Sequence, residues 1–205
     1  MNDAARDQPQ RCPWTGIAEP IYARYHDEEW GVPLESDAAL FEKLVLEGFQ
    51  SGLSWLTILR KRDGFRKAFH KFDAQRIARY SEKDVLRLMN DASIVRNRAK
   101  IEATITNARA FLKLSEGGGL AALMWGMARE TPPTHGVPRG MTDIPSQTPA
   151  SQRISKALKH NGFRFVGPTT IYALMQSAGM VNDHLASCPR REPCARLQKR
   201  FKAPS

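Results

Sequence analysis

Four potential metal ligands, divided between the two ends of the chain, constrain the fold more than any other feature of the sequence. Cys12 and His26 lie near the start, whereas His184 and Cys188 lie near the end. The second pair has i, i+4 spacing, so both side chains can project from one face of a helical turn. Two thiolates and two imidazoles complete a tetrahedral zinc site and leave no coordination position for a reactive water. We therefore predict one structural zinc ion that joins the N- and C-terminal segments.

The chain carries a large excess of positive charge. Its 205 residues include 31 Lys and Arg against 21 Asp and Glu, which gives a formal net charge of +10. Such a protein is drawn to a phosphate backbone because binding releases counterions. The charge suggests a polyanionic partner, although many basic proteins bind nucleic acid only incidentally.

Cysteine content and hydropathy indicate a cytoplasmic protein. Three cysteines cannot form a disulfide scaffold, and Cys194 is left over from the two candidate ligands. Residues 1–10 lack the apolar segment of a signal peptide, and we expect them to be a disordered extension. No apolar run approaches the roughly 18 residues that would span a bilayer, so we expect no membrane insertion.

Hydrophobic periodicity predicts an all-α protein. Ser36 is placed to cap one helix, and Ser81 with Asp84 forms a capping-box pattern ahead of another. The basic run 60–62 is predicted to end a helix, and glycines 117–119 are predicted to end a longer one. The alternation typical of half-buried strands is hardly seen. Apolar residues recur at helical spacing in segments 40–45, 53–59, 85–89 and 101–112.

Two segments interrupt this helical pattern. Residues 131–149 contain five prolines and two glycines, which predicts a surface loop or a connection between lobes. The helical pattern resumes at Ile154 and Leu158. Residues 189–205 form a basic tail, which we expect to be a mobile, solvated end of the chain.

Residues 156–172 predict two helices joined by a tight hairpin. Gly162 can adopt the left-handed conformation that follows a helix, and Pro168 suits the first position of the next helix. The helix that opens after Gly167 exposes backbone N–H groups to which an anion can bind. A helix-hairpin-helix of this kind holds a DNA strand without reading its sequence, whereas the alternative is an ordinary helical turn. The basic residues around the hairpin are Lys156, Lys159 and Arg164.

Several separate segments closely resemble the motifs of one family, the type I 3-methyladenine DNA glycosylases of the helix-hairpin-helix glycosylase superfamily. The resemblance runs from about Arg11 to Cys188. It implies one glycosylase domain over 11–188, with the helix-hairpin-helix near 154–179 and zinc bound at the four positions named above. The matching segments are RCPW (11–14), YARYHDEEWG (22–31), LEGFQSGLSW (46–55), GFRFVG (162–167) and VNDH (181–184).

The resemblance also implies an activity. The expected reaction is hydrolysis of the N-glycosidic bond of 3-methyladenine in double-stranded DNA during base-excision repair, which releases the base and leaves an abasic site. We expect no nucleotide cofactor, and we expect the protein to act as a monomer. Such an enzyme must first rotate the damaged nucleotide out of the duplex, at a cost of a few kcal/mol.

The same resemblance assigns a base pocket to four aromatic residues. Methylation at N3 makes adenine cationic, and each well-placed aromatic ring attracts a cation by roughly 0.5–2 kcal/mol. Core packing is the alternative role, and it is the one we expect for Trp30 and Trp125. The pocket residues are Trp14, Tyr22, Tyr25 and Trp55.

Glu47 is the carboxylate we expect to bind the base and support catalysis. It lies at the end of an apolar helix and precedes Gly48, so we expect it in a partly desolvated pocket rather than in bulk solvent. There it can accept hydrogen bonds from the amino edge of adenine and balance the charge of the cationic base. Asp183 is a secondary candidate, because relatives in the superfamily use an aspartate shortly after the hairpin. It directly precedes His184, however, and can instead orient that ligand or cap a helix.

DNA contacts are expected in two places. Gly52 and Leu53 match the segment of the family that approaches the gap left by the extruded base, although a packed leucine is a simpler explanation. In the hairpin, the expected contacts are Lys159, Gly162, Arg164 and Gly167.

Two other functions remain open at this point. A non-catalytic DNA-binding module would show affinity for DNA without base release. A metallohydrolase that uses the zinc directly would require an open coordination position and a nearby carboxylate base.

Overall fold

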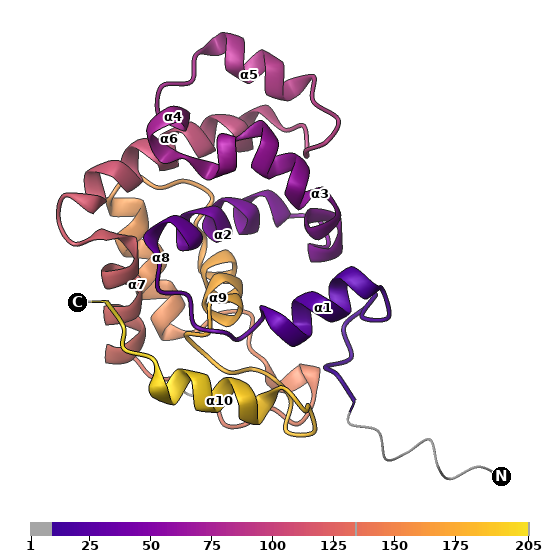
Figure 1. The fold of residues 1–205 in the computed structure, drawn as a ribbon. Coiled ribbons are helices and arrows are strands. Elements are labelled where there is room, and N and C mark those ends of the chain that lie inside the picture. The colour runs from indigo at the N-terminus through magenta and orange to yellow at the C-terminus, as the bar shows by residue number, and fades with distance from the viewer. Residues whose placement is uncertain (1–9, 134, 205) are drawn as a thin grey trace.

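In this computed structural model, which describes residues 10–133 and 135–204, every regular element is helical (Figure 1). The extension predicted for residues 1–10 lies, apart from Gln10, outside the described residues. The α-helices are α1 (Pro20–Glu28), α2 (Asp37–Gln50), α3 (Trp55–Ala68), α4 (Ala74–Ile77), α5 (Glu82–Met89), α6 (Arg98–Ser115), α7 (Gly119–Glu130), α8 (Pro149–His160), α9 (Pro168–Ser177) and α10 (Arg191–Arg200). Short 3-10 turns lie at His70–Phe72 (η2) and Met141–Asp143 (η3).

Helix α2 lies at the centre of the molecule and packs against α3, α6, α7 and α9 (Figure 1). As predicted, Ser36 caps it, and the hydroxyl accepts a hydrogen bond from the Ala39 N–H at 3.4 Å. Leu40, Phe41 and Leu44 are almost completely buried. A helix surrounded by others places some of its polar residues inside the protein as well, and Lys43 and Glu47 are both buried.

The predicted helix termini are confirmed in two places and wrong in a third. Asp84 accepts a hydrogen bond from the Ser81 N–H at 3.0 Å, as in a capping box, and α6 ends just before glycines 117–119. Helix α3, however, continues through the basic run 60–62 to Ala68. These basic residues do not end the helix, because each has a partner in another segment: Arg60 pairs with Glu19 at 2.9 Å, the Lys61 ammonium donates to the Ala92 carbonyl at 2.7 Å, and Arg62 pairs with Glu29 at 2.6 Å.

The prediction of a mobile basic tail is wrong for residues 191–200, which form α10, the yellow helix of Figure 1. Cys194 is completely buried on its inner face. The Gln198 side chain donates hydrogen bonds to the carbonyl oxygens of Gly31 and Val181 at 3.1 and 3.2 Å. Phe201, which follows the helix, packs on Trp125 at a ring separation of 4.4 Å. The many charged residues of this segment leave little apolar periodicity from which a packed helix could be predicted.

The hairpin between α8 and α9 has the predicted form. Gly162 has a positive φ of 88°, and Pro168 is the first residue of α9. Asn107 of α6 holds the hairpin by accepting from the Arg164 N–H at 2.7 Å and donating to the Arg164 carbonyl at 3.0 Å. Phe165 also has a positive φ of 56°, a conformation that is uncommon for a bulky residue.

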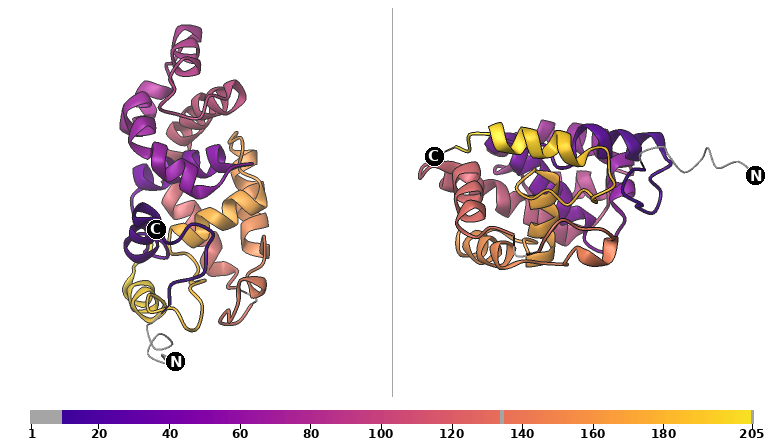
Figure 2. Two further views of the ribbon diagram at one scale, coloured as in Figure 1. Left: turned by 90° about the vertical axis from the view of Figure 1, so that its right-hand side faces the viewer. Right: turned by 90° about the horizontal axis from the view of Figure 1, so that it is seen from below.

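The segment before α1 lies next to the segment between α9 and α10, although the two ends of the described chain lie on opposite sides of the molecule (Figure 1). Both views of Figure 2 place the indigo segment before α1 next to the yellow segment before α10. In the described residues, no helix combines the length and apolar character needed to cross a bilayer.

Candidate active site and metal centre

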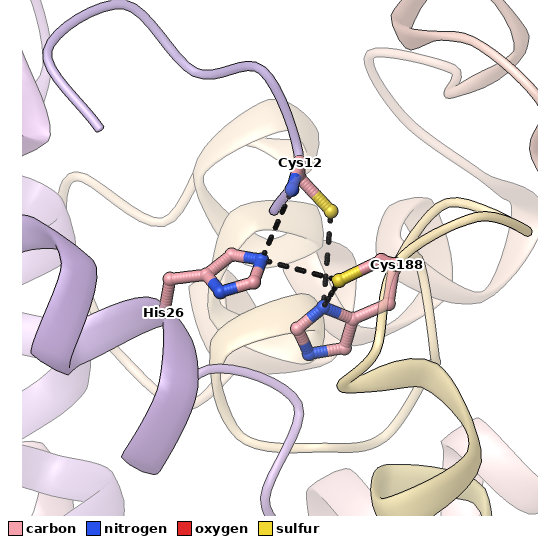
Figure 3. A group of neighbouring side chains, drawn as sticks. Cys12, His26 and Cys188 are labelled. Atoms are coloured by element: carbon pink, nitrogen blue, oxygen red, sulfur yellow. Dashed lines mark hydrogen bonds between the residues drawn. The ribbon is translucent and has the colours of Figure 1, made fainter. Parts of the chain in front are cut away.

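The four predicted ligands meet in one buried cluster (Figure 3). Cys12 precedes α1, and His26 is in the last turn of that helix. His184 and Cys188 come from the segment between α9 and α10. Their four ligand atoms all lie within 4.8 Å of one another.

The spacing of these atoms suits a tetrahedral metal ion. With bonds of about 2.3 Å to sulfur and about 2.05 Å to nitrogen, tetrahedral geometry separates a sulfur from a nitrogen by about 3.6 Å. The Cys188 Sγ lies 3.4 Å from the His184 Nδ1 and 3.5 Å from the His26 Nε2. The Cys12 Sγ lies 3.8 Å from the His184 Nδ1. This Cys2His2 group can therefore hold a metal ion.

Surrounding groups orient both imidazole rings. The His184 Nε2 lies 3.1 Å from the Trp30 carbonyl oxygen, so this nitrogen donates and Nδ1 faces the cluster. The His26 Nδ1 lies 2.8 Å from the Asp27 carboxylate, which accepts two further hydrogen bonds from Arg11 at 2.9 and 2.7 Å. Partners of this kind fix the tautomer of a ligating histidine. The cluster is thus set up for the binding of a metal by one nitrogen of each ring.

An aromatic cavity of about 330 Å³ lies beside the cluster. It is bounded by α1, the end of α2, the start of α3, the η3 segment and α9. All four predicted pocket aromatics line it, together with Glu47. The structure adds several lining residues that the sequence did not indicate: Trp30, Gln50, Met141, Ile144, Thr169, Tyr172, Gln176 and Ser177.

The metal cluster supports one wall of this cavity. Trp14 packs edge-on against His26 with ring centres 4.9 Å apart, and Trp30 packs edge-on against His184 at 4.6 Å. Trp14 and Trp30 are themselves in edge contact at 4.7 Å. Trp30 is buried as predicted, but it also lines the cavity. Ligands and pocket therefore belong to one packed unit.

Glu47 provides a buried carboxylate at the cavity. Only 3 % of the residue is exposed, and its Oε1 accepts a hydrogen bond from the Ser177 hydroxyl at 3.2 Å. Burial raises the pKa of Glu47 to about 7, although the positive charge of Lys43 and the Ser177 hydrogen bond oppose the shift. The alternative of a solvent-facing acid is excluded. Glu47 changes charge near neutral pH inside an aromatic pocket.

Trp55, which also lines this pocket, carries a buried donor group. In the described residues its indole N–H is buried without a hydrogen-bond partner. A buried donor of this kind costs about 1–3 kcal/mol until it is satisfied. The residues that line the cavity therefore include a buried carboxylate, on Glu47, and a buried N–H group without a partner, on Trp55.

Asp183 does not play either structural role considered from the sequence. Its carboxylate accepts hydrogen bonds from the Tyr172 hydroxyl at 2.6 Å and the Gln176 side chain at 2.8 Å. It also lies 2.8 Å from the His135 Nε2. Since Tyr172 and Gln176 line the cavity, Asp183 orders that wall, whereas the Trp30 carbonyl orients the His184 ring. His135 belongs to the proline-rich loop, where no local pattern indicated a functional contact.

Both expected DNA-contacting segments border the cavity. Gln50 and Thr169, which line it, lie next to the α2–α3 turn and to the hairpin. In the turn, Gly52 has a positive φ of 82° and Leu53 is 42 % exposed, so the packed-leucine explanation is wrong. Lys159, Gly162 and Arg164 of the hairpin are exposed, and Gly167 is half-buried.

A buried lysine, not indicated by the sequence, fixes the α2–α3 turn. The Lys100 ammonium donates hydrogen bonds to the carbonyl oxygens of Phe49 and Ser51, at 2.8 and 2.6 Å. Carbonyl groups at the end of a helix lack intrahelical partners, and a cation there also complements the helix dipole. Lys100 thereby holds the turn that presents Leu53.

Comparison with known proteins places this geometry in a family. The family model for methyladenine glycosylase matches residues 14–191. The chain is 45 % identical over 180 residues to the DNA-3-methyladenine glycosylase of Haemophilus influenzae, which covers 87 % of this chain and 96 % of that protein. A crystal structure of a 3-methyladenine DNA glycosylase I superposes with a TM-score of 0.83, at 46 % identity over 88 % of this chain and 98 % of that one.

A second solved structure concerns recognition of the base itself. It describes 3-methyladenine recognition by the 3-methyladenine DNA glycosylase I of Staphylococcus aureus. It superposes with a TM-score of 0.81, at 35 % identity over 86 % of this chain and 94 % of that one. Because the family model matches most of the length of this chain, the chain belongs to the methyladenine glycosylase family.

Proposed function

We propose that this protein is a base-excision DNA glycosylase that hydrolyses the N-glycosidic bond of 3-methyladenine and leaves an abasic site. The observation that carries the proposal is the buried carboxylate of Glu47 in an aromatic cavity of a methyladenine glycosylase. Relatives over nearly the whole chain are DNA-3-methyladenine glycosylases.

The cavity suits a flat cationic base. We assign base binding to Trp14, Tyr22, Tyr25 and Trp55, whose rings attract the positive charge. Glu47 balances that charge and accepts a hydrogen bond from the exocyclic amino group. Unmodified adenine presents the same amino group but no positive charge, so it gains less from the pocket. Extrusion also favours a methylated base, because weakly paired bases leave the duplex at lower cost.

Glu47 is also our candidate for the catalytic residue. The cationic base is already a good leaving group, so the enzyme needs little acid catalysis. The remaining demand is to stabilise the oxocarbenium-like sugar and to orient a water molecule. A carboxylate beside the base supplies the negative charge for the first of these tasks.

We propose zinc as the metal of the Cys2His2 cluster and assign it a structural role. Two sulfurs and two nitrogens at tetrahedral spacing are typical of zinc, and four protein ligands fill its coordination shell. When bound, zinc would tie the N-terminal segment to the segment before α10. This ligand count argues against a hydrolase that activates water at the metal.

DNA is held, in this proposal, from both sides of the cavity. The amides at the start of α9 bind a phosphate, with Lys159, Gly162, Arg164 and Gly167 forming the basic hairpin around them. On the other side, Gly52 and Leu53 enter the space left by the extruded base. We propose double-stranded DNA as the substrate and a monomer as the active form, because one chain supplies the whole cavity.

Single-turnover release of 3-methyladenine from methylated duplex DNA tests the function. The wild-type protein should release the free base, and Glu47→Gln should reduce the rate by roughly one to two orders of magnitude, since a charge-assisted hydrogen bond is worth about 1.5–3 kcal/mol. Affinity for an abasic duplex should stay unchanged. Binding without any release by the wild-type protein would instead identify a non-catalytic DNA-binding module.

Asp183→Asn provides the contrast, because Asp183 acts through Tyr172 and Gln176. Asp183→Asn should lower the stability of the protein more than it changes the preference for the methylated base. If Glu47→Gln releases the base at the wild-type rate while Asp183→Asn abolishes release with the metal retained, the principal carboxylate is Asp183.

A further inference from the structure

A buried lysine lies behind the aromatic wall of the base cavity. Lys43 of α2 is only 8 % exposed, although lysine is almost never buried without a partner. Its ammonium lies 4.8 Å from the centre of the Tyr25 ring and 5.7 Å from the centre of the Trp55 ring. These two rings are therefore in contact with a cation before any base enters.

Lys43 approaches these rings from outside the base cavity. It lines a second cavity of about 230 Å³, and Trp55 lines both cavities. The arginines of the second cavity are paired: Arg62 with Glu29 at 2.6 Å and Arg66 with Glu42 at 2.8 Å. Trp55 thus separates the Lys43 ammonium from the space proposed for the cationic base.

Lys43 and Glu47 lie one turn apart on the same helix, so their side chains are neighbours on its surface. Burial is the main influence that lowers the pKa of Lys43, and the positive charge of Arg62 acts in the same direction, whereas the negative charges of Glu47 and Glu29 oppose them. In return, the positive charge of Lys43 is the largest influence that lowers the pKa of Glu47. Each charge makes the burial of the other less unfavourable.

Other charged and titratable groups surround the pair from every neighbouring element. Helix α1 supplies Tyr22 and Tyr25, the residue after it is Glu29, and α3 supplies Arg62 beside Lys43. From α9, Ser177 donates its hydroxyl to Glu47, while Tyr172 and Gln176 line the same cavity but are bound by Asp183. Of the cations that face the pair, Lys43 is the one whose charge influences Glu47 directly.

Building on the function proposed above, we propose that Lys43 is a positioning residue that acts through Glu47 and through the rings of Tyr25 and Trp55. Its charge maintains the carboxylate of Glu47 in the ionised form that receives the base. The same charge lies against the outer faces of the two rings and weakens their attraction for a second cation on the cavity side. It therefore reduces the preference of the cavity for cationic over neutral bases.

Removal of this charge should therefore have opposite effects at low and high pH. In Lys43→Met, the Glu47 carboxylate loses a nearby positive charge, so it takes up a proton at a higher pH. A neighbouring positive charge lowers a carboxyl pKa by about one unit or more, so its removal raises the pKa by a similar amount. On the acidic side, base release should fall by about tenfold. On the alkaline side, where Glu47 is ionised in both proteins, the cavity of the variant is more negative, and release of a cationic base should be as fast as in the wild type or faster.

The first test is the pH profile of 3-methyladenine release between pH 5.5 and 9. For Lys43→Met, we expect the acidic limb to move to higher pH by about one unit and the two profiles to cross. Lys43→Arg, which keeps the charge, should leave the midpoint near that of the wild type. A merely structural role for Lys43 predicts a lower rate at every pH with an unchanged midpoint, and that result would overturn the proposal.

The second test does not depend on catalysis. Carbon-13 NMR of the Glu47 carboxyl group in the free protein should give a higher titration midpoint for Lys43→Met than for the wild type. Equal midpoints would refute the coupling even if the enzyme releases base normally. If the midpoint is shifted in Lys43→Met but the wild-type protein releases no base, the proposed function is refuted and the coupling between Lys43 and Glu47 still holds.

The third test measures charge preference. Quenching of tryptophan fluorescence can give dissociation constants for 9-methyladenine, which is neutral, and for 3,9-dimethyladeninium, which is permanently charged. The extra methyl group contributes equally in both proteins, so it cancels when the two affinity ratios are compared. At pH 8.5 we expect Lys43→Met to increase the preference for the cation several-fold, and an unchanged or reduced preference would contradict the moderating role.

Discussion

Replacement of Glu47 by glutamine should stabilise the protein at alkaline pH while it impairs the reaction. The pKa of the buried carboxyl is raised from 4.5 to about 7. An acid whose pKa is raised by folding binds its proton more tightly in the folded state. Its contribution to stability is therefore complete below pH 4.5 and is lost as the pH rises through about 7. Above that pH the fold must keep a carboxylate buried, and glutamine removes this cost.

The size of the effect follows from the shift. A shift of about 2.5 units corresponds to about 3 kcal/mol, at 1.36 kcal/mol per unit. For a protein of this length, each kcal/mol changes Tm by roughly 2–4 °C. Glu47→Gln should then melt roughly 6–12 °C above the wild type at pH 8.5 and close to the wild type at pH 5. Ser177 can still donate its hydrogen bond to the glutamine side-chain oxygen.

Thermal unfolding of both proteins at a series of pH values provides the measurement. Loss of metal at low pH affects both proteins alike, so the difference in Tm at each pH is the relevant quantity. Glu116→Gln, at an exposed glutamate after α6, serves as the control and should show the same small difference throughout. If the difference for Glu47→Gln does not depend on pH, then the buried carboxylate is not the source of the instability.

Two further predictions concern the metal and the hairpin. The purified protein should contain about one zinc per chain. Cys188→Ala should lose both the metal and much of its stability, whereas Cys194→Ala should retain the metal. Retention of full zinc by Cys188→Ala would remove Cys188 from the ligand set. Gly167→Asp should weaken binding to all DNA sequences alike, because its carboxylate repels the phosphate. Gly167→Ala should not weaken binding, because a Cβ at this position would meet no atom within 4 Å. Lys159→Ala should reduce the slope of log K against log salt concentration by about one unit. Unchanged affinity for an abasic duplex in both Gly167→Asp and Lys159→Ala would refute the hairpin assignment.

The parts of the site that could be predicted from sequence are those with a local signature. Cys and His are the residue types that bind zinc, so Cys12, His26, His184 and Cys188 could be grouped before their distances were known. The hairpin was predictable because Gly162 and Pro168 favour particular backbone conformations. Glu47 and the pocket aromatics were identified through the family motifs.

The missed features depend on tertiary contacts between distant segments. Asp183 orders Tyr172 and Gln176, and its partner His135 comes from a loop without periodicity. Lys43 and Lys100 look like surface residues in the sequence, yet both are buried. The charges of residues 191–200 similarly suggested a solvated tail, because the single buried Cys194 is a weak signal of a packed helix. His135 lies 48 residues from Asp183, Phe49 lies 51 residues from Lys100, and the Tyr25 ring that contacts Lys43 belongs to another helix. Pattern analysis provides no information on such partners.

The Cys2His2 cluster joins a segment near the start of the chain to a segment near its end, which has a consequence for synthesis. Contacts in the cluster join residues separated by 162 and 172 positions, so they close nearly the longest loop the chain can form. Such contacts form late in folding, because the chain must lose the entropy of closing a long loop before the contacts can stabilise it. Trp14 and Trp30, which pack on the cluster histidines, can take their final positions only after residue 188 has left the ribosome. A prematurely terminated chain would therefore lack a complete base cavity, so an incomplete copy of the protein would not act on DNA.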